Sequence, residues 1–141
     1  MWRHPVIKSL WKLHFINTWL IFTFQPYLNV CGITKIRYYL TRLRVPSHRL
    51  YIESGRWAKP NPVPVEDRQC NICNTLEDEY HFLIECILYT NLRCQYIPRY
   101  FRFRPNMQTL IELITNENSV IIKHLGIYVC KAFELNHSNR Y

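Results

Sequence analysis

Glycine is scarce in this sequence. Three glycines occur in 141 residues, against eight prolines. Tight hairpin turns depend on glycine, so the scarcity argues against a sheet built from hairpins and favours helices joined by proline-containing loops. Hydrophobic residues make up 48% of the chain and aromatic residues 15%, enough for a core of moderate size. We therefore expect a mostly α fold in one small helical domain.

Long hydrophobic runs are also missing. No charged residue lies in Leu13–Thr34, but polar residues and a proline interrupt this stretch, and its continuous apolar run covers only 19–22. A bilayer core requires about 20 residues. We interpret 6–24 as a core helix that begins after Pro5 and ends before Pro26. A membrane anchor is the alternative, and no membrane partner is expected.

Signatures of common catalytic centres are absent from the sequence. It contains no glycine-rich phosphate loop, no Gly-x-Ser-x-Gly turn and no acidic pair like the one that holds two metal ions in a polymerase. The acidic run Glu77, Asp78 and Glu79 falls in the expected first turn of a short helix, where carboxylates favour the helix dipole. The chain is therefore predicted not to be an enzyme, and no small-molecule substrate is expected.

Acidic residues are few before Cys70. Eleven Lys and Arg face three Asp and Glu in that part, whereas seven face seven from Cys70 onward, so the net charge of +8 comes from the first half. This distribution favours a polyanionic partner, most simply RNA or DNA. A basic surface that only keeps the protein in solution is the alternative.

The charges of the first half fall on a predicted helix over 33–44. At about 100° per residue, its apolar residues share one side and its cations lie opposite or along one edge. The apolar set is Ile33, Ile36, Tyr39, Leu40 and Leu43. The candidate residues for phosphate contacts are Lys35, Arg37, Arg42, Arg44, Arg49 and Arg56, with Tyr38 and Trp57 nearby for stacking. An ordinary solvated helix face is the alternative.

Proline and glycine positions predict the segments after this helix. Pro46 ends it, Ser47 is expected to cap a short helix that runs to Ser54, and Gly55 is expected to supply a left-handed end. Three prolines at 58–65 predict a stiff, extended connector.

Cysteine and histidine cluster in CNICNTLEDEYHFLIEC at 70–86. Cys70 and Cys73 form a C-x2-C pair, and His81 and Cys86 follow at gaps of seven and four residues. Three thiolates and one imidazole suit Zn²⁺, and four donors close a tetrahedron with no open position. We therefore predict one structural Zn²⁺ in an embedded Cys-Cys-His-Cys zinc knuckle. The alternative is a site without metal, in which three buried cysteines lie near a core histidine. Cys94 is a candidate to replace one of the four ligands.

The residues between the ligands predict a turn followed by a helix. Thr75 and Asp78 match a variant of the capping box, so a short helix is expected to start near Leu76 and carry His81 back to the knuckle. Cys86 lies five positions after His81, further round than an i,i+4 pair, and is expected at or just past the helix end.

Helices are also predicted after the knuckle. One covers 90–97, a second is capped by Asn106 and a third by Ser119. Between the first two, RYFRFRP at 99–105 alternates arginines with rings, a pattern suited to single-stranded nucleic acid. We prefer the alternative, in which the rings belong to the core and the arginines extend outward.

From about Ser9 onward the chain resembles the extreme C-terminal part of non-LTR retrotransposon polyproteins and the short reading frames derived from them. The resemblance is carried by LTRLRVPSHRLYIESGRW at 40–57, PVEDRQCNIC at 64–73, EDEYHFLIEC at 77–86 and LYTNLR at 88–93. That family usually has proline directly after the last cysteine, where this chain has Ile87. The resemblance implies a reverse-transcriptase-associated zinc-binding region that handles RNA or DNA and has no catalytic centre of its own.

Two functional hypotheses result. The first is a non-catalytic zinc module of retrotransposon origin that binds RNA or DNA with low sequence specificity through its basic half. The second is an interaction module in which zinc folds a helical platform that docks a reverse transcriptase or another protein. A metal hydrolase would require an open coordination position. A standalone chain without a selected role is a further interpretation.

The expected organisation has four parts. They are a basic helical region at 1–57, a proline-rich connector at 58–69, the zinc-binding knuckle and helix at 70–97, and C-terminal helices of the same domain at 98–141. Thiolate ligands require a reducing compartment, and the sequence shows no signal-peptide pattern. We therefore expect an intracellular location, in the cytoplasm or the nucleus.

Overall fold

The computed structural model describes residues 26–30, 32–45 and 47–138. The elements in chain order are α2 (Pro26–Val30), α3 (Thr34–Arg44), α4 (Tyr51–Ser54), the 3-10 segments η1 (Gly55–Trp57) and η2 (Val65–Asp67), the π-helical turn η3 (His81–Glu85), the 3-10 segment η4 (Ile87–Tyr89), α5 (Thr90–Tyr96), α6 (Arg99–Arg102), α7 (Met107–Ile114) and α8 (Ser119–Ser138). The mostly α fold is confirmed, since the described residues hold one isolated bridge, Gln69 with Leu76, and no strand.

The helix predicted over 6–24 lies outside the described residues, and so does most of the stretch considered as a membrane anchor. Within the described part, each helix is too short or too polar to cross a bilayer.

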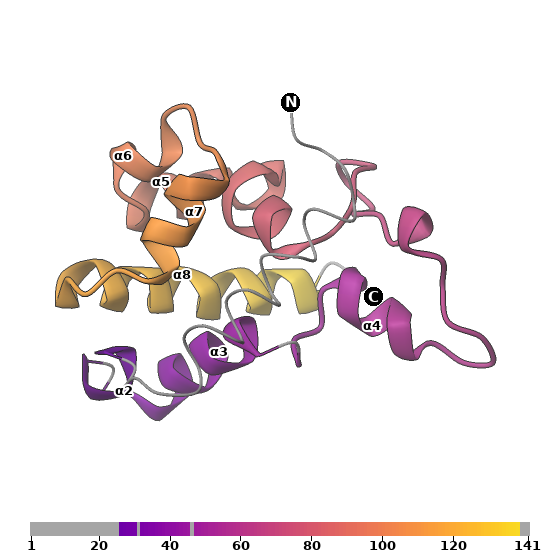
Figure 1. Cartoon of the computed structure of the whole chain (residues 1–141), viewed down its shortest axis with the longest axis horizontal. Coiled ribbons are helices and arrows are strands. Elements are labelled where there is room, and N and C mark those ends of the chain that lie inside the picture. Colours follow the sequence, from indigo (N-terminus) through magenta and orange to yellow (C-terminus); the bar gives the residue numbers. More distant parts are fainter. Residues whose placement is uncertain (1–25, 31, 46, 139–141) are drawn as a thin grey trace.

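Helix α8 is the axis around which the other helices pack (Figure 1). Helices α2 and α3 lie along one side of it, α5 to α7 lie on the other, and the knuckle and α4 lie towards its C-terminal end. The most buried side chains of α8 include Leu125, Tyr128 and Val129, which recur at helical spacing. Burial on two sides explains why α8 has few charges along most of its length.

Helices α3 and α8 cross closely at Gly126. A Cβ atom at this position would lie 2.2 Å from Cγ2 of Ile36 and 3.1 Å from Cδ1 of Leu40. Both of these side chains are buried on the inner face of α3. The two helices therefore approach to a distance that only glycine permits.

Helix α3 follows the predicted range with one difference. Ile36, Leu40 and Leu43 are buried, and Tyr39 packs against the core as predicted. Ile33 was expected on the same side, but it precedes the helix in an extended conformation and is exposed. Without the helical twist, its side chain does not follow the apolar side of α3.

One of the two predicted C-terminal helix caps is confirmed, and the other lies one residue earlier than predicted. Asn106 accepts a hydrogen bond from the Thr109 amide at 2.9 Å and completes a capping box at α7. Ser119, which was predicted to cap α8, is its first helical residue, and the cap is Asn118, which accepts from the amides of Val120 at 2.9 Å and Ile121 at 3.3 Å. Amides two and three positions along the chain are the ones that a capping side chain reaches.

The start and end of α4 differ from the prediction. Leu50, not Ser47, precedes this helix, and the free Tyr51 amide donates to the carboxylate of Glu77 at 2.7 Å. Gly55 has φ of −66°, so the left-handed end was wrong. Glycine is needed there for space, because a Cβ would lie 2.9 Å from Cγ and Cδ of Arg68.

The proline-rich connector folds back instead of running extended. The Val63 amide donates to the Gly55 carbonyl at 2.9 Å, which closes the loop that projects at the right of Figure 1. The buried side chain of Arg68 donates to the carbonyls of Val63 at 2.8 Å and Ile52 at 2.9 Å. Arg68 therefore ties the connector to α4.

Candidate metal centre

The four predicted ligands come together in space. One ligand atom from each of Cys70, Cys73, His81 and Cys86 can be chosen so that all four lie within 4.8 Å of one another. The Sγ atom of Cys86 lies 3.9 Å from that of Cys70 and 3.8 Å from that of Cys73, and all three thiols are free. Zn–S bonds of about 2.3 Å at tetrahedral angles place two sulfurs about 3.8 Å apart. The sulfur spacing therefore fits a tetrahedral metal ion.

The imidazole of His81 is also oriented as a ligand. Its Nε2 atom is buried and has no hydrogen-bond partner among the described residues, whereas Nδ1 lies 3.1 Å from Oγ1 of Thr75 and 3.6 Å from Oε2 of Glu85. A histidine that binds a metal through one ring nitrogen usually donates a hydrogen bond from the other nitrogen to a carboxylate, a carbonyl or water. Nε2 is therefore the atom that would bind the ion.

Short local hydrogen bonds form the knuckle at 70–75. The Cys70 amide donates to the Thr75 carbonyl at 2.8 Å, and the Asn74 amide donates to the Cys70 carbonyl at 2.9 Å. Asn74 has φ of 52°, a left-handed conformation that asparagine tolerates better than most residues. This turn brings Cys70 and Cys73 to the same side as the helix that follows.

That helix begins later than the sequence predicted. Leu76 pairs with Gln69 in the isolated bridge, and the helical residues start at Glu79. Asp78 caps the helix by accepting from the His81 amide at 2.8 Å. The predicted start near Leu76 was wrong because Thr75, which was to cap it, contacts the His81 ring instead.

A π-helical turn then aligns His81 with Cys86. In an α-helix, residues five apart face directions that differ by about 140°. Here the Cys86 amide donates to the His81 carbonyl at 2.8 Å, an i to i+5 bond that widens the turn and stacks these two positions. Cys86 lies directly after the helix end, as predicted.

Burial sets the protonation of Cys86 in the metal-free chain. Burial, with a smaller contribution from the neighbouring Cys70 and Cys73, raises the pKa of Cys86 to about 12, although a backbone hydrogen bond from Leu88 opposes the shift. For His81, burial lowers the pKa, but the neighbouring Glu85 carboxylate and Cys70 thiol outweigh burial and raise the pKa overall. A bound cation would replace protons at both positions.

Arg93, which was not predicted to have a role, supports the end of this helix. Its buried guanidinium donates from Nε to the Leu83 carbonyl and from Nη2 to the Cys86 carbonyl, both at 2.8 Å. Arg93 shares a helical row with the buried Tyr89 and Ile97, at spacings of four residues. That row was the signal in the sequence for an inward-facing arginine.

Tyr128 of α8 completes this support. Its hydroxyl donates to the Phe82 carbonyl at 2.7 Å, next to the ligand His81. Burial raises the pKa of Tyr128 above its usual value, so the hydroxyl stays a donor. The central helix is thereby bonded directly to the metal-binding segment.

The acidic run is buried, and its partners lie far along the chain. Besides accepting from Tyr51, Glu77 accepts from the side-chain amide of Asn136 at 3.3 Å. Glu79 lies 2.5 Å from Nε2 of His48 in a buried pair. The dipole role predicted for all three acids holds only for Asp78, because Glu77 precedes the helix and Glu79 turns towards His48.

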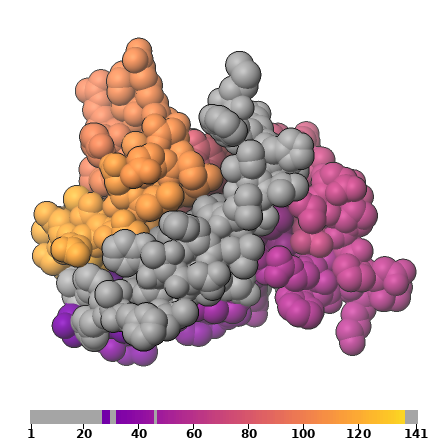
Figure 2. Space-filling model, viewed as in Figure 1, coloured from indigo at the N-terminus to yellow at the C-terminus, as the bar shows by residue number. Residues whose placement is uncertain are grey.

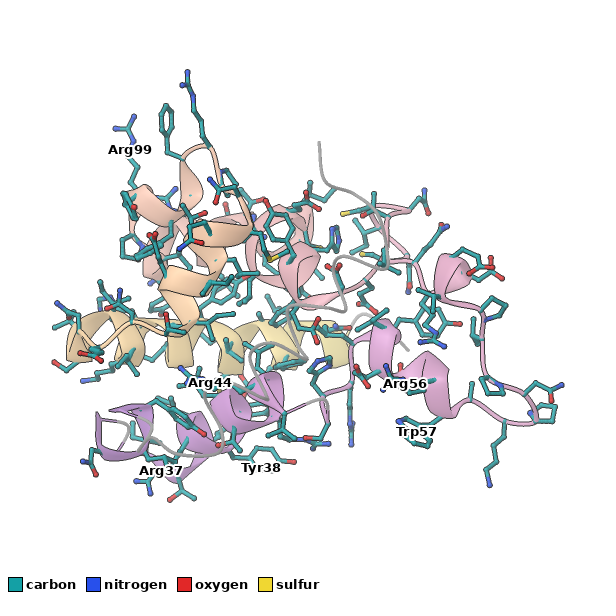
Figure 3. The ribbon with its side chains drawn as sticks, viewed as in Figure 1. Arg37, Tyr38, Arg44, Arg56, Trp57 and Arg99 are labelled. Carbon is teal, nitrogen blue, oxygen red and sulfur yellow. The ribbon has the colours of Figure 1, made fainter. Side chains whose placement is uncertain are left out.

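The predicted cations of α3 have different surroundings. Lys35 is exposed and pairs with Glu134, and Arg42 donates to the Ser47 carbonyl at 2.7 Å and lies over the Tyr38 ring. Arg37 is half-buried and, with Tyr38, points away from the body (Figure 3). Arg44 instead packs over the Tyr27 ring at 4.3 Å and donates to the Ile114 carbonyl. These contacts hold Arg44 against the protein, so it is less suited to bind phosphate than the sequence predicted.

The remaining two predicted cations flank α4. Arg49 is exposed, and Arg56 is exposed with Nη1 at 3.6 Å from a carboxylate oxygen of Glu53. Trp57 next to it is 74% exposed. Figure 3 shows Arg37 and Tyr38 below α3 at the lower left, and Arg56 with Trp57 on a separate segment at the right of the view. The exposed cations and the two exposed rings therefore lie on two segments, α3 and the residues around α4.

Comparison of the chain with models of protein families, with curated proteins and with solved structures finds no match. The resemblance to retrotransposon polyproteins therefore stays a prediction from the sequence.

Proposed function

We propose that this chain is a non-catalytic zinc-binding module, derived from a retrotransposon polyprotein, that binds RNA or DNA through a basic surface. We define the basic surface as Lys35, Arg37, Arg42, Arg49 and Arg56 with the rings of Tyr38 and Trp57. The observation that carries the proposal is the closed set of four donors around the orphaned Nε2 of His81. Three thiolates and one imidazole leave no position for a substrate, so the ion would have a structural role.

Hydrogen bonds connect the metal site to the basic surface. Glu77 lies between the knuckle and the ligand His81, and its carboxylate and carbonyl accept from the amides of Tyr51 and Ile52. These amides start α4, which is flanked by Arg49 and Arg56. A bound ion that fixes the knuckle would therefore also fix the α4 part of the basic surface.

Charge and aromatic content support nucleic acid as the ligand. Phosphate contacts need cations that solvent can reach, and the basic surface supplies five, exposed or half-buried, next to two exposed rings. The net charge of +8 adds long-range attraction for a polyanion. Because side chains on such a surface meet phosphates and not base edges, low sequence specificity is expected.

Two measurements test the proposal. Native mass spectrometry of the purified chain is expected to show one zinc ion that is lost on denaturation. Fluorescence anisotropy with short RNA and DNA is expected to give an affinity that falls steeply with salt. The double variant Arg42→Glu/Arg56→Glu should lose most of this affinity. Lys123→Glu, at an exposed site on α8, is the control for net charge. Affinity that ignores salt, or that survives the double variant, would refute nucleic-acid binding.

Trp57 supports a second candidate, a module that docks a reverse transcriptase or another protein. Its large exposed ring is of a type enriched at protein interfaces. This candidate is favoured if a partner protein co-purifies without nucleic acid and Trp57→Ala releases it.

A further inference from the structure

The turn formed by α6 and the residues after it is strongly basic. Four arginines and no acidic residue lie between Glu85 and Glu112, and three of these arginines alternate with aromatic residues at 99–104. A core position was expected for the three rings. In the structure only Phe101 is buried, at 5% exposure, whereas Tyr100 is 64% and Phe103 is 59% exposed. Two of the three rings therefore face solvent, which the core interpretation does not explain.

Two guanidinium groups approach the exposed ring of Phe103. The Cζ atom of Arg99 lies 5.7 Å from the ring centroid and that of Arg104 lies 5.4 Å from it, both within the range of cation–π attraction. Within the described part of the chain, neither arginine forms an ion pair with an acidic side chain. Their positive charges are therefore available to a ligand.

Other contacts hold the turn in place without a ligand. Phe101 anchors it in the core and meets the Tyr100 ring edge-on at 5.0 Å. The Tyr100 hydroxyl donates to Oε2 of Glu112 at 3.0 Å, and Arg102 donates to the Ile97 carbonyl at 2.7 Å. A surface that is already ordered loses less conformational entropy when it binds.

We propose that this turn, which we call the α6 turn (Arg99–Arg104), binds an unpaired nucleotide of single-stranded RNA or DNA. The base stacks on Phe103 in the place of one of the two guanidinium groups, and Arg99 and Arg104 contact the phosphates on either side of it. An acidic peptide would use the two cations but not the ring, whereas a nucleotide uses both. A base inside a duplex is stacked on its neighbours and is not free for this contact. The proposal rests on the proposed nucleic-acid function and names its strand type.

The α6 turn is separate from the basic surface. Helix α8 lies between α6 and α3, and Arg99 points away from the molecule on the side opposite Arg37 and Tyr38 (Figures 1 and 3). Figure 2 shows this part of the chain, in orange, as a projection above the body. The two regions therefore contact different stretches of a bound strand, and their effects can be measured separately.

Substitution of Phe103 tests the proposal. Phe103→Leu removes the stacking surface and keeps an apolar side chain, and Phe103→Tyr keeps the ring as the control. Anisotropy is measured with one labelled oligonucleotide, free and annealed to its complement. Phe103→Leu is expected to weaken single-strand binding about 5- to 150-fold, the usual range for one stacked base. Duplex binding and the Phe103→Tyr variant should stay near wild type, and thermal unfolding of all variants should coincide.

The outcomes separate this proposal from the proposed function. If the wild-type chain binds neither strand type, the proposed function fails and this proposal fails with it. If binding depends on Arg42 and Arg56 but Phe103→Leu has no effect on single strands, only the α6 turn proposal is overturned. If an acidic peptide displaces the single strand equally well from wild type and from Phe103→Leu, the ring adds nothing to binding of the strand, and the proposal is also overturned.

Discussion

The three glycines provide the sharpest test of the packing. Gly126→Ala places a methyl group 2.2 Å from Cγ2 of Ile36, where carbon atoms pack at about 3.5–4.0 Å. The β-branched Ile36 is stiff in a helix, so α3 and α8 must separate by about 1 Å or more. Overpacking of this kind costs about 1–3 kcal/mol, and we expect the upper end because both helices are rigid. The gain in helix propensity from alanine offsets about 1 kcal/mol.

We therefore expect Gly126→Ala to lower the free energy of unfolding by about 2 kcal/mol and the melting temperature by about 6 °C. Gly32→Ala is the matched control, because no atom of the described residues lies within 4 Å of its added methyl group, and its effect should stay within about 0.5 kcal/mol. Gly55→Ala displaces only the side chain of Arg68 and should fall between the two. Urea unfolding in the presence of zinc measures all three. Equal stability of the Gly126→Ala and Gly32→Ala variants would refute the close crossing.

Further predictions concern the metal-binding segment. Arg93→Met leaves two buried carbonyls without their donor and should destabilise the chain by about 3–5 kcal/mol in urea unfolding, whereas Arg99→Met should change it by less than about 0.5 kcal/mol. Tyr128→Phe removes one buried hydrogen bond and should cost about 1–2 kcal/mol in the same assay. Because burial raises the pKa of Cys86, zinc must displace protons, so its affinity should fall at least about tenfold per pH unit on acidification, as followed by competition with a chelator.

The cluster of candidate metal ligands could be predicted from the sequence because its chemistry and spacing are local. Donor type and number indicated a closed site, and the ligand atoms do converge. The π-helical turn could not be predicted, because it forms only when His81 and Cys86 must face the same site. The start of α7 could also be predicted, because its cap, Asn106, bonds to an amide only three residues along the chain.

Contacts between distant segments could not be predicted from the sequence. Gly55 was assigned a left-handed conformation from its place after a helix, but the space it leaves is filled by Arg68, which the sequence does not place beside it. Glu77 and Glu79 were assigned to the first turn of a short helix, but their partners come from α4, from the segment before it and from the end of α8. Sequence patterns predict interactions between residues that are close along the chain, whereas the partners of these residues are close only in the folded structure.

The position of α8 has a consequence for the order of events during translation. Every described element that packs on α8 leaves the ribosome before it, so the inner faces of α3 and α5 have no cover until the last segment emerges. The knuckle is different, because its four donors fall within one short stretch of polypeptide and can capture an ion at once. Nascent chains are therefore expected to carry a preformed metal-bound nucleus and to wait for α8 before they become compact.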